Sequence, residues 1–85
     1  MNEPQSGGAP VRSLDLLSPG EVGVIVGLDG DAAIARRLME LGLVRGTRVE
    51  VVRRAPLGDP VELRIRQVHL SIRRSEAAHI HVASA

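Results

Sequence analysis

The chain has 85 residues and a formal net charge of +1 at pH 7, and it contains no Phe, Tyr, Trp, Cys or Lys. This length suits a single domain with a small core. The missing residue types exclude disulfide bonds and thiolate zinc sites, a P-loop lysine for nucleotide phosphates, and the aromatic platforms on which single-stranded nucleic acid stacks.

The first thirteen residues, MNEPQSGGAPVRS, predict a flexible N-terminal tail rather than part of the domain. They hold an early acid and a Ser-Gly-Gly-Ala-Pro cluster, but no apolar core of the kind found in secretory signals. The longest apolar run, around residues 22–28, is interrupted by glycine and is far shorter than the roughly 20 residues that cross a bilayer. We therefore expect a cytoplasmic protein with one folded domain at residues 14–83.

The first predicted strand is EVGVIVGL, residues 21–28, which is rich in β-branched residues and bounded by Pro-Gly and Asp-Gly turns. The segment DAAIARRLMELGL then predicts one helix over about residues 32–41, with Asp31 as its N-cap. Gly42 is expected to end this helix in the left-handed conformation, so that Leu43 can contact Leu38.

The predicted helix has one apolar and one charged face. Helical spacing places three apolar residues in one stripe, namely Ile34, Leu38 and Leu41. Three charged residues lie away from that stripe and are expected to face solvent, namely Arg36, Arg37 and Glu40. These charged residues form a candidate surface for pairing with charged groups on a partner.

Four further strands are predicted after the helix, at residues 47–52, 61–66, 69–73 and 79–83. The first two alternate apolar and charged residues, so each has one buried and one solvent-facing side. The alternation changes phase at Gln67, which predicts a turn or bulge near Arg66 and Gln67, and SEAAH predicts a short turn before the last strand. Five short strands lose their exposed edges by curling up. The sequence therefore predicts a mostly β fold, a small five-stranded barrel with one inserted helix.

No motif in the chain predicts catalysis. The glycines at positions 20, 23, 27 and 30 match neither G-x-G-x-x-G nor the P-loop spacing, and they indicate turns and bulges instead. No serine lies in the pattern of a strained nucleophile elbow beside a base. We therefore predict that the protein is not an enzyme.

The histidines offer a candidate metal site. His79 and His81 lie two residues apart on a predicted strand, so their side chains project from the same face, and His69 lies on another strand that is a candidate neighbour. Two imidazoles are one or two ligands short of a zinc or iron site. A site for iron or another divalent transition metal and a pair of solvated histidines both remain open, and no other cofactor is expected.

Three arginine pairs, at residues 36–37, 53–54 and 73–74, stand out in a chain whose acids and arginines are otherwise interspersed. A duplex-binding domain usually concentrates its basic charge on one face, and this chain does not. The pairs are therefore interpreted as solvated surface at the ends of elements, with an acidic protein or a phosphate as the alternative partner.

The loop APLGDP, residues 55–60, joins two strands that a two-residue turn would have connected. Pro56 and Pro60 stiffen this loop, and Gly58 permits a positive φ. Leu57 is then either held outward as a docking residue or folded back to plug one end of the barrel. The predicted partner-binding residues of the loop are Leu57, Gly58, Asp59 and Pro60.

Several motifs follow one another in a fixed order along the chain. They are L-x-x-L-x-x-G-E-x-G-x-I from Leu14 to Ile25, R-R-L-x-E-L-G-L-x-x-G-T-x-V from Arg36 to Val49, A-P-L-G-D-P, and V-x-L-S-I-R-R-S-E-A. This ordered set covers nearly the whole chain from Leu14 to Val82 and resembles the FeoA family, ferrous iron transport protein A. One departure is Gln67, which stands where the family often has a glycine.

The resemblance implies a small cytoplasmic SH3-like barrel with a helical insertion. Such proteins are non-enzymatic accessories of bacterial ferrous iron uptake that are thought to act by contact on the membrane GTPase transporter FeoB. The implied partner is the cytoplasmic region of FeoB, with only an indirect relation to the membrane and no nucleic acid. The small core also favours self-association. The alternative is a small metal-binding or metal-sensing domain that uses His79 and His81, and a third is a nucleic-acid-binding barrel that uses the arginine pairs.

Overall fold

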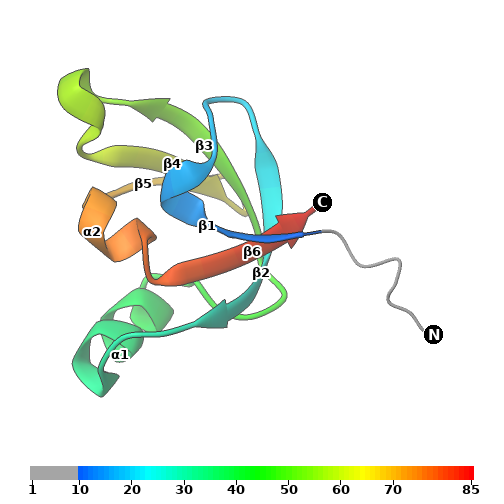
Figure 1. Cartoon of the computed structure of the whole chain (residues 1–85), viewed down its shortest axis with the longest axis vertical. Helices are drawn as coiled ribbons and strands as arrows, with labels where there is room; N and C mark the ends of the chain where they lie inside the picture. The colour runs from blue at the N-terminus through cyan, green and yellow to red at the C-terminus, as the bar shows by residue number, and fades with distance from the viewer. Residues whose placement is uncertain (1–9) are drawn as a thin grey trace.

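The computed structural model describes residues 10–85, and the part of the predicted tail at residues 1–9 lies outside the described residues. The described residues contain six strands, namely β1 (Val11–Ser13), β2 (Val22–Leu28), β3 (Arg48–Arg54), β4 (Val61–Ile65), β5 (Val68–Ile72) and β6 (Ile80–Ser84). The helical elements are α1 (Ala32–Glu40), the short α2 (Arg74–Ala77) and two 3₁₀ turns, η2 (Leu14–Leu16) and η3 (Pro56–Gly58). Figure 1 shows how these elements are arranged.

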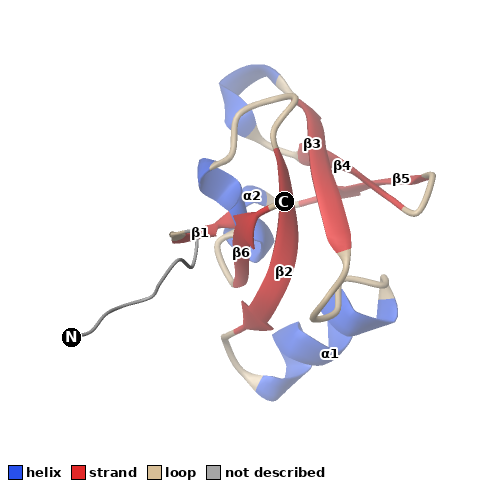
Figure 2. Cartoon of the chain, turned by 90° about the vertical axis from the view of Figure 1, so that its right-hand side faces the viewer, coloured by secondary structure: helices blue, strands red, loops and turns tan. Residues whose placement is uncertain are grey.

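All six strands form one antiparallel sheet in the order β1-β6-β2-β3-β4-β5, and the sheet curls around a single core (Figures 1 and 2). The mostly β barrel with one main helix is confirmed, but it has six strands instead of five. The extra strand, β1, lies in residues that the sequence placed in the tail. Val11 pairs with Ala83 and Ser13 pairs with His81, so backbone pairing with β6 orders a segment that has no alternating pattern of its own.

The ends of α1 follow the sequence prediction. The backbone N–H of Ile34 donates to Asp31 Oδ1 over 2.9 Å, which is the expected N-cap. Gly42 has a φ of +94°, and the N–H of Leu43 donates to the Leu38 carbonyl over 3.1 Å, which is the 6→1 bond of a Schellman ending. The prediction that Leu41 completes the apolar stripe is wrong, because Leu41 is the C-cap residue and remains 38% exposed. Leu43 is instead the leucine that is buried in the core at this end of the helix.

The predicted change of phase between β4 and β5 is a two-residue turn. Arg66 and Gln67 both have positive φ, 46° and 68°, as in the type I′ turns that connect tight hairpins. The segment SEAAH, expected to be a turn, begins inside the short helix α2. This helix forms because the Glu76 carboxylate accepts the N–H of Arg73 over 2.8 Å and caps its N-terminus.

An entirely aliphatic core fills the curl of the sheet. It draws on every strand except β1 and the exposed end of β5, together with α1, α2 and η2. Its buried members are Leu14, Leu17, Ile25, Leu38, Leu43, Val49, Val51, Val61, Leu63, Ile65, Ile72, Ala77, Ile80 and Val82. Since α2 and η2 supply Ala77 and Leu14, they help close the barrel that the sheet alone leaves open.

Candidate partner-binding surfaces

The loop between β3 and β4 holds Leu57 away from the domain. The Leu57 side chain is 98% exposed, so the alternative that it plugs the barrel is wrong. Its φ of 69° is in the left-handed region, which costs an L-residue other than glycine about 1–2 kcal/mol. Gly58 next to it also has a positive φ, 82°, as the sequence predicts. A leucine that gains no burial and bears backbone strain is a candidate for a functional role.

The rest of the loop is fixed by hydrogen bonds. The N–H of Gly58 donates to the Ala55 carbonyl over 2.8 Å, and the N–H of Ala55 donates to the Pro60 carbonyl over 3.1 Å. The Asp59 carboxylate accepts the backbone N–H of Arg74 over 3.0 Å. Gly58, Asp59 and Pro60 therefore hold the loop in place, and the Leu57 side chain is its exposed large apolar group.

The base of the loop is anchored by Arg54. Its guanidinium donates to the backbone carbonyls of Asp15 and Leu17, the latter over 2.6 Å. The sequence interpretation of Arg54 as solvated surface is therefore wrong, because this side chain is partly buried and joins β3 to η2. Arg53 does lie in solvent, 3.7 Å from the Glu62 carboxylate.

The charged face of α1 is the second predicted surface. A shallow hollow of about 380 Å³ follows this face and is lined by Ala32, Ala33, Arg36, Arg37 and Glu40. Arg37 is already engaged, because its Nε lies 2.6 Å from Glu76 Oε2 and this hydrogen bond raises the pKa of Arg37 and lowers that of Glu76. Arg36 and Glu40 form no ion pair with any other residue in 10–85, so they remain available to a partner.

The two predicted surfaces lie far apart. In both views the loop that contains η3 is at one end of the molecule and α1 is at the other (Figures 1 and 2). The structure therefore does not bring Leu57 together with Arg36 and Glu40 into one patch.

The two C-terminal histidines converge on one carboxylate that the sequence prediction missed. His79 Nδ1 lies 2.7 Å from Asp29 Oδ1, and His81 Nε2 lies 2.5 Å from Asp29 Oδ2. The hydrogen bonds from His81 and then His79 hold the pKa of Asp29 below its ordinary value. Asp29 directly follows β2. The sequence marked this residue only as part of an Asp-Gly turn and not as a partner of the histidines. The histidines do face outward as predicted.

His69 does not join this cluster, because β5 is separated from β6 by β4, β3 and β2 in the sheet. Within residues 10–85 no group of three or more His, Cys, Asp or Glu side chains is arranged to hold a metal ion. No helix in the same range is long and apolar enough to cross a bilayer.

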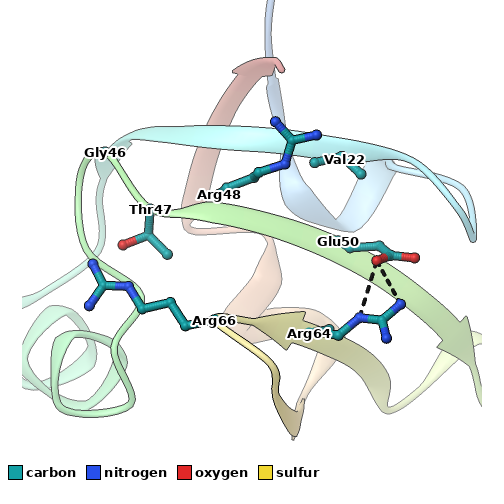
Figure 3. A pocket seen from close by; sticks show the side chains of 7 residues that line it. All are labelled: Val22, Gly46, Thr47, Arg48, Glu50, Arg64 and Arg66. Atoms are coloured by element: carbon teal, nitrogen blue, oxygen red, sulfur yellow. Dashed lines mark hydrogen bonds and ion pairs between the residues drawn. The ribbon is translucent and has the colours of Figure 1, made fainter.

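A basic hollow on the outside of the sheet was also missed (Figure 3). It measures about 440 Å³ and is lined by Val22, Gly46, Thr47, Arg48, Glu50, Arg64 and Arg66. Glu50 accepts two hydrogen bonds from Arg64, over 2.9 and 3.2 Å, which leaves Arg48 and Arg66 without an ion pair in the described chain. The sequence signal for this hollow was the alternation of charged residues in β3 and β4. These two strands are neighbours in the sheet, and Glu50 pairs with Arg64 in their register.

Comparison with known proteins gives one family. Residues 12–84 match the model of the FeoA domain. A curated relative from Porphyromonas gingivalis, an Fe(2+) transport protein A/Fe(2+) transporter FeoB fusion protein, is 42% identical over 69 residues, which are 81% of this chain. The chain spans only 8% of the length of that relative.

Two solved structures show the same fold. The FeoA protein from Chlorobium tepidum is 41% identical, with a TM-score of 0.79 over 86% of this chain and 70% of its own. A zinc complex of FeoA from Stenotrophomonas maltophilia, described as an SH3 domain protein, is 32% identical, with a TM-score of 0.72 over 84% of this chain and 88% of its own. The expected SH3-like architecture is therefore confirmed.

Proposed function

Because the chain belongs to the FeoA domain family, which is associated with ferrous iron transport, we propose that it is a non-enzymatic accessory protein of bacterial ferrous iron uptake. In this proposal it acts in the cytoplasm by direct contact with the transporter FeoB. It touches the membrane only through that partner, and nucleic acid has no part in its action.

The observation that carries the proposal is the fusion relative, in which a segment 42% identical to this chain belongs to one polypeptide with a FeoB transporter. A covalent link raises the effective concentration of two domains for each other, to the millimolar range for a short flexible linker. Selection for such a link is expected when the two parts work by touching. This supports contact between the separate proteins as well.

We place the main contact at Leu57. An ordered leucine on a fixed loop loses little further entropy on binding, and burying its side chain in an apolar pocket is worth about 2 kcal/mol. The exposed pair Arg36 and Glu40 on α1 lies at the other end of the molecule and would adjust association rate and salt dependence instead of affinity.

The test is a pull-down of the untagged protein with the cytoplasmic domain and with full-length FeoB of the same organism. Leu57→Glu is expected to abolish binding and to leave the fold intact, since the side chain is fully exposed. Val11→Glu is the matched control, because Val11 is also an exposed aliphatic residue, on β1 away from the loop. Binding that survives Leu57→Glu would remove the loop from the proposal, and no binding to either form of FeoB would overturn the contact itself.

A metal-binding or metal-sensing role is the second candidate, and the convergence of His79 and His81 on Asp29 favours it. A divalent transition metal would have to replace the two hydrogen bonds and draw all three side chains toward itself. Equilibrium titration of the untagged protein with zinc or, without oxygen, ferrous iron tests this role. A saturable site that disappears when His79→Ala and His81→Ala are combined would support it, and the absence of a saturable site would refute it.

A further inference from the structure

Strand β5 is an open edge of the sheet. It is paired on one side with β4, and it stands last in the strand order. The hairpin that β4 and β5 form projects from the rest of the barrel (Figure 2). Val68, His69 and Ser71 are exposed, with Val68 at 56%, Leu70 is half-buried, and Ile72 at the far end of the strand is buried. The edge is therefore accessible along most of its length.

The register shows which backbone groups this edge offers. Ile65 and Val68 close the two-residue type I′ turn, so they form a hydrogen-bonded pair, and such pairs alternate along an antiparallel ladder. His69 and Ser71 therefore direct their N–H and C=O groups away from β4. Neither residue makes another backbone or side-chain hydrogen bond within residues 10–85. Four hydrogen-bonding groups are thus free in one row.

The composition of this edge departs from the usual protection of such strands. Natural edge strands are blunted by charged residues, proline or bulges, which discourage pairing with another chain. The five residues of β5, VHLSI, include no Lys, Arg, Asp, Glu or Pro, and no register shift interrupts their pairing with β4. The edge is built in a way that permits a further strand.

Arginines stand at both ends of this uncharged strand. Arg66 lies in the turn that precedes it, and Arg73 and Arg74 follow it directly. All three are exposed, and none is ion-paired within residues 10–85. Because exposed charges act over a Debye length of about 8 Å at physiological salt, these arginines favour the approach of an acidic segment over a basic one.

We propose that the β5 edge binds an extended segment of a partner protein as a seventh, antiparallel strand, with aliphatic residues at alternate positions and acidic residues at both ends. Main-chain hydrogen bonds to His69 and Ser71 supply the pairing, and the acidic ends meet Arg66 at one end and Arg73 and Arg74 at the other. The aliphatic residues extend the side of the sheet that carries Val68, Leu70 and Ile72.

A second copy of this chain fits the edge less well. Symmetric antiparallel pairing of β5 with itself would centre on Leu70 and would place Arg66 of one copy beside Arg74 of the other at both ends. Like charges that are brought close together repel each other, which opposes this pairing. Charge complementarity therefore selects an acidic segment over self-pairing.

The test uses a synthetic peptide, acetyl-Asp-Glu-Val-Thr-Val-Thr-Val-Asn-Glu-amide, titrated into the full-length protein and followed by amide NMR. Saturable binding is expected, with slowed hydrogen exchange at His69 and Ser71. N-methylation of both threonines, whose amides would face β5, should weaken binding at least about tenfold, because the pairing hydrogen bonds are lost. N-methylation of the central valine, whose amide would point away, is the matched control. Replacing the three acids by lysine should also weaken binding.

Protein variants test the same edge from the other side. Ser71→Pro removes an N–H that points away from β4, so the hairpin should keep its fold, as proline does on edge strands, and lose the peptide. Ser71→Ala retains the N–H and should bind normally. Arg66→Gln combined with Arg74→Gln should bind weakly and lose the advantage of the acidic over the lysine peptide.

Three results would overturn the proposal. The first is no binding at millimolar peptide, and the second is binding that both Ser71→Pro and threonine N-methylation leave unchanged. The third is protection of His69 and Ser71 from hydrogen exchange that rises with protein concentration in the absence of peptide, which would assign the edge to self-pairing. The edge does not include Leu57, although its C-terminal end adjoins the loop through the hydrogen bond between Asp59 and Arg74, and the peptide test does not involve FeoB. A failed peptide test therefore does not contradict the proposed contact with FeoB. A failed FeoB pull-down likewise does not contradict peptide binding at the β5 edge.

Discussion

The guanidinium of Arg37 lies 2.6 Å from the carboxylate of Glu76 and ties α1 to α2 across 39 residues of sequence. The same carboxylate caps α2 by accepting the N–H of Arg73. The Glu76 side chain is 14% exposed, whereas the Arg37 side chain is 60% exposed. One side chain therefore links the two helices and caps one of them.

Glu76→Gln is expected to lower the free energy of unfolding at pH 7 by up to about 1 kcal/mol, because it removes the charge that pairs with Arg37, while the amide oxygen of glutamine can still accept the N–H of Arg73. Glu62→Gln is the matched control, since its pair with Arg53 is longer and more exposed, and it should cost clearly less. Urea denaturation at pH 7 measures both. Equal losses in the two variants would contradict the role given to Glu76.

The effect of Glu76 should also depend on pH. Its hydrogen bond with Arg37 lowers its pKa in the folded state. A carboxyl with a lowered folded pKa contributes stability above its unfolded value, about 4.3, and loses that contribution as the pH falls through the folded value. The difference in unfolding free energy between the wild type and Glu76→Gln should therefore be complete at about pH 6 and should shrink toward about pH 3. A difference that is constant over this range would refute the assignment.

Leu57→Asn should stabilise the domain. Asparagine tolerates the left-handed backbone that Leu57 adopts, and the leucine side chain has no burial to lose. We expect a gain of about 0.5–1 kcal/mol, which is a rise of several degrees in the melting temperature, together with weaker binding to FeoB. Leu16→Asn is the control, because Leu16 is exposed but has no positive φ, and it should give no gain. A destabilised Leu57→Asn variant would mean that the leucine packs against the domain.

Gly42→Ala tests the end of α1. An alanine at a φ of +94° is strained, and its Cβ would lie 3.1 Å from Ile65 Cδ1. The expected loss is about 1–2 kcal/mol, or a fall of roughly 4–8 °C for each kcal/mol in a domain of this size. Gly27→Ala provides the comparison, since no heavy atom lies within 4 Å of the added Cβ and φ is not positive there. Thermal unfolding that falls equally in both variants would be inconsistent with this ending of the helix.

The Asp29 cluster can be followed by titration. Asp29 should show a carboxyl pKa below its ordinary value in a ¹³C NMR titration, because His81 and His79 hydrogen-bond to it. His81→Ala should raise this pKa more than His79→Ala, since the bond from His81 makes the larger contribution, and the double variant should restore an ordinary value. The stability that this carboxylate supplies is present above its unfolded pKa and is lost as the pH falls through the folded one. An Asp29 pKa unaffected by His81→Ala would contradict the hydrogen-bonded cluster.

Local chemistry made much of the fold predictable. The N-cap at Asp31, the left-handed Gly42 and the turn at Arg66 and Gln67 each depend on a few neighbouring residues, and the structure contains all three. Burial on β3, β4 and β6 follows from alternation in the same way. The exposed display of Leu57 was one of two interpretations, and only the structure separates them, because the sequence does not say which way a fixed loop points.

Features that depend on distant pairing were not predictable. Strand β1 forms because its backbone pairs with β6, and the local sequence VRS contains no pattern that predicts a strand. Arg54 became an internal anchor because η2 brings the carbonyls of Asp15 and Leu17 to it from 39 and 37 residues away. Asp29 likewise meets His79 and His81 across 50 and 52 residues. No local sequence pattern marks any of these residues as a contact partner. The contacts form only when the strands pair in the order of the folded sheet.

The pairing of β1 with β6 places the first strand of the described chain beside the last, with Val11 opposite Ala83 (Figure 1). A short glycine-serine linker should therefore join these ends without strain, and new termini can then be opened elsewhere by circular permutation. The turn at Arg66 and Gln67 would place them next to β5, while an opening at Gly46 would place them just before β3. A permuted chain could thus carry a fused reporter at either position while the loop at Leu57 stays continuous.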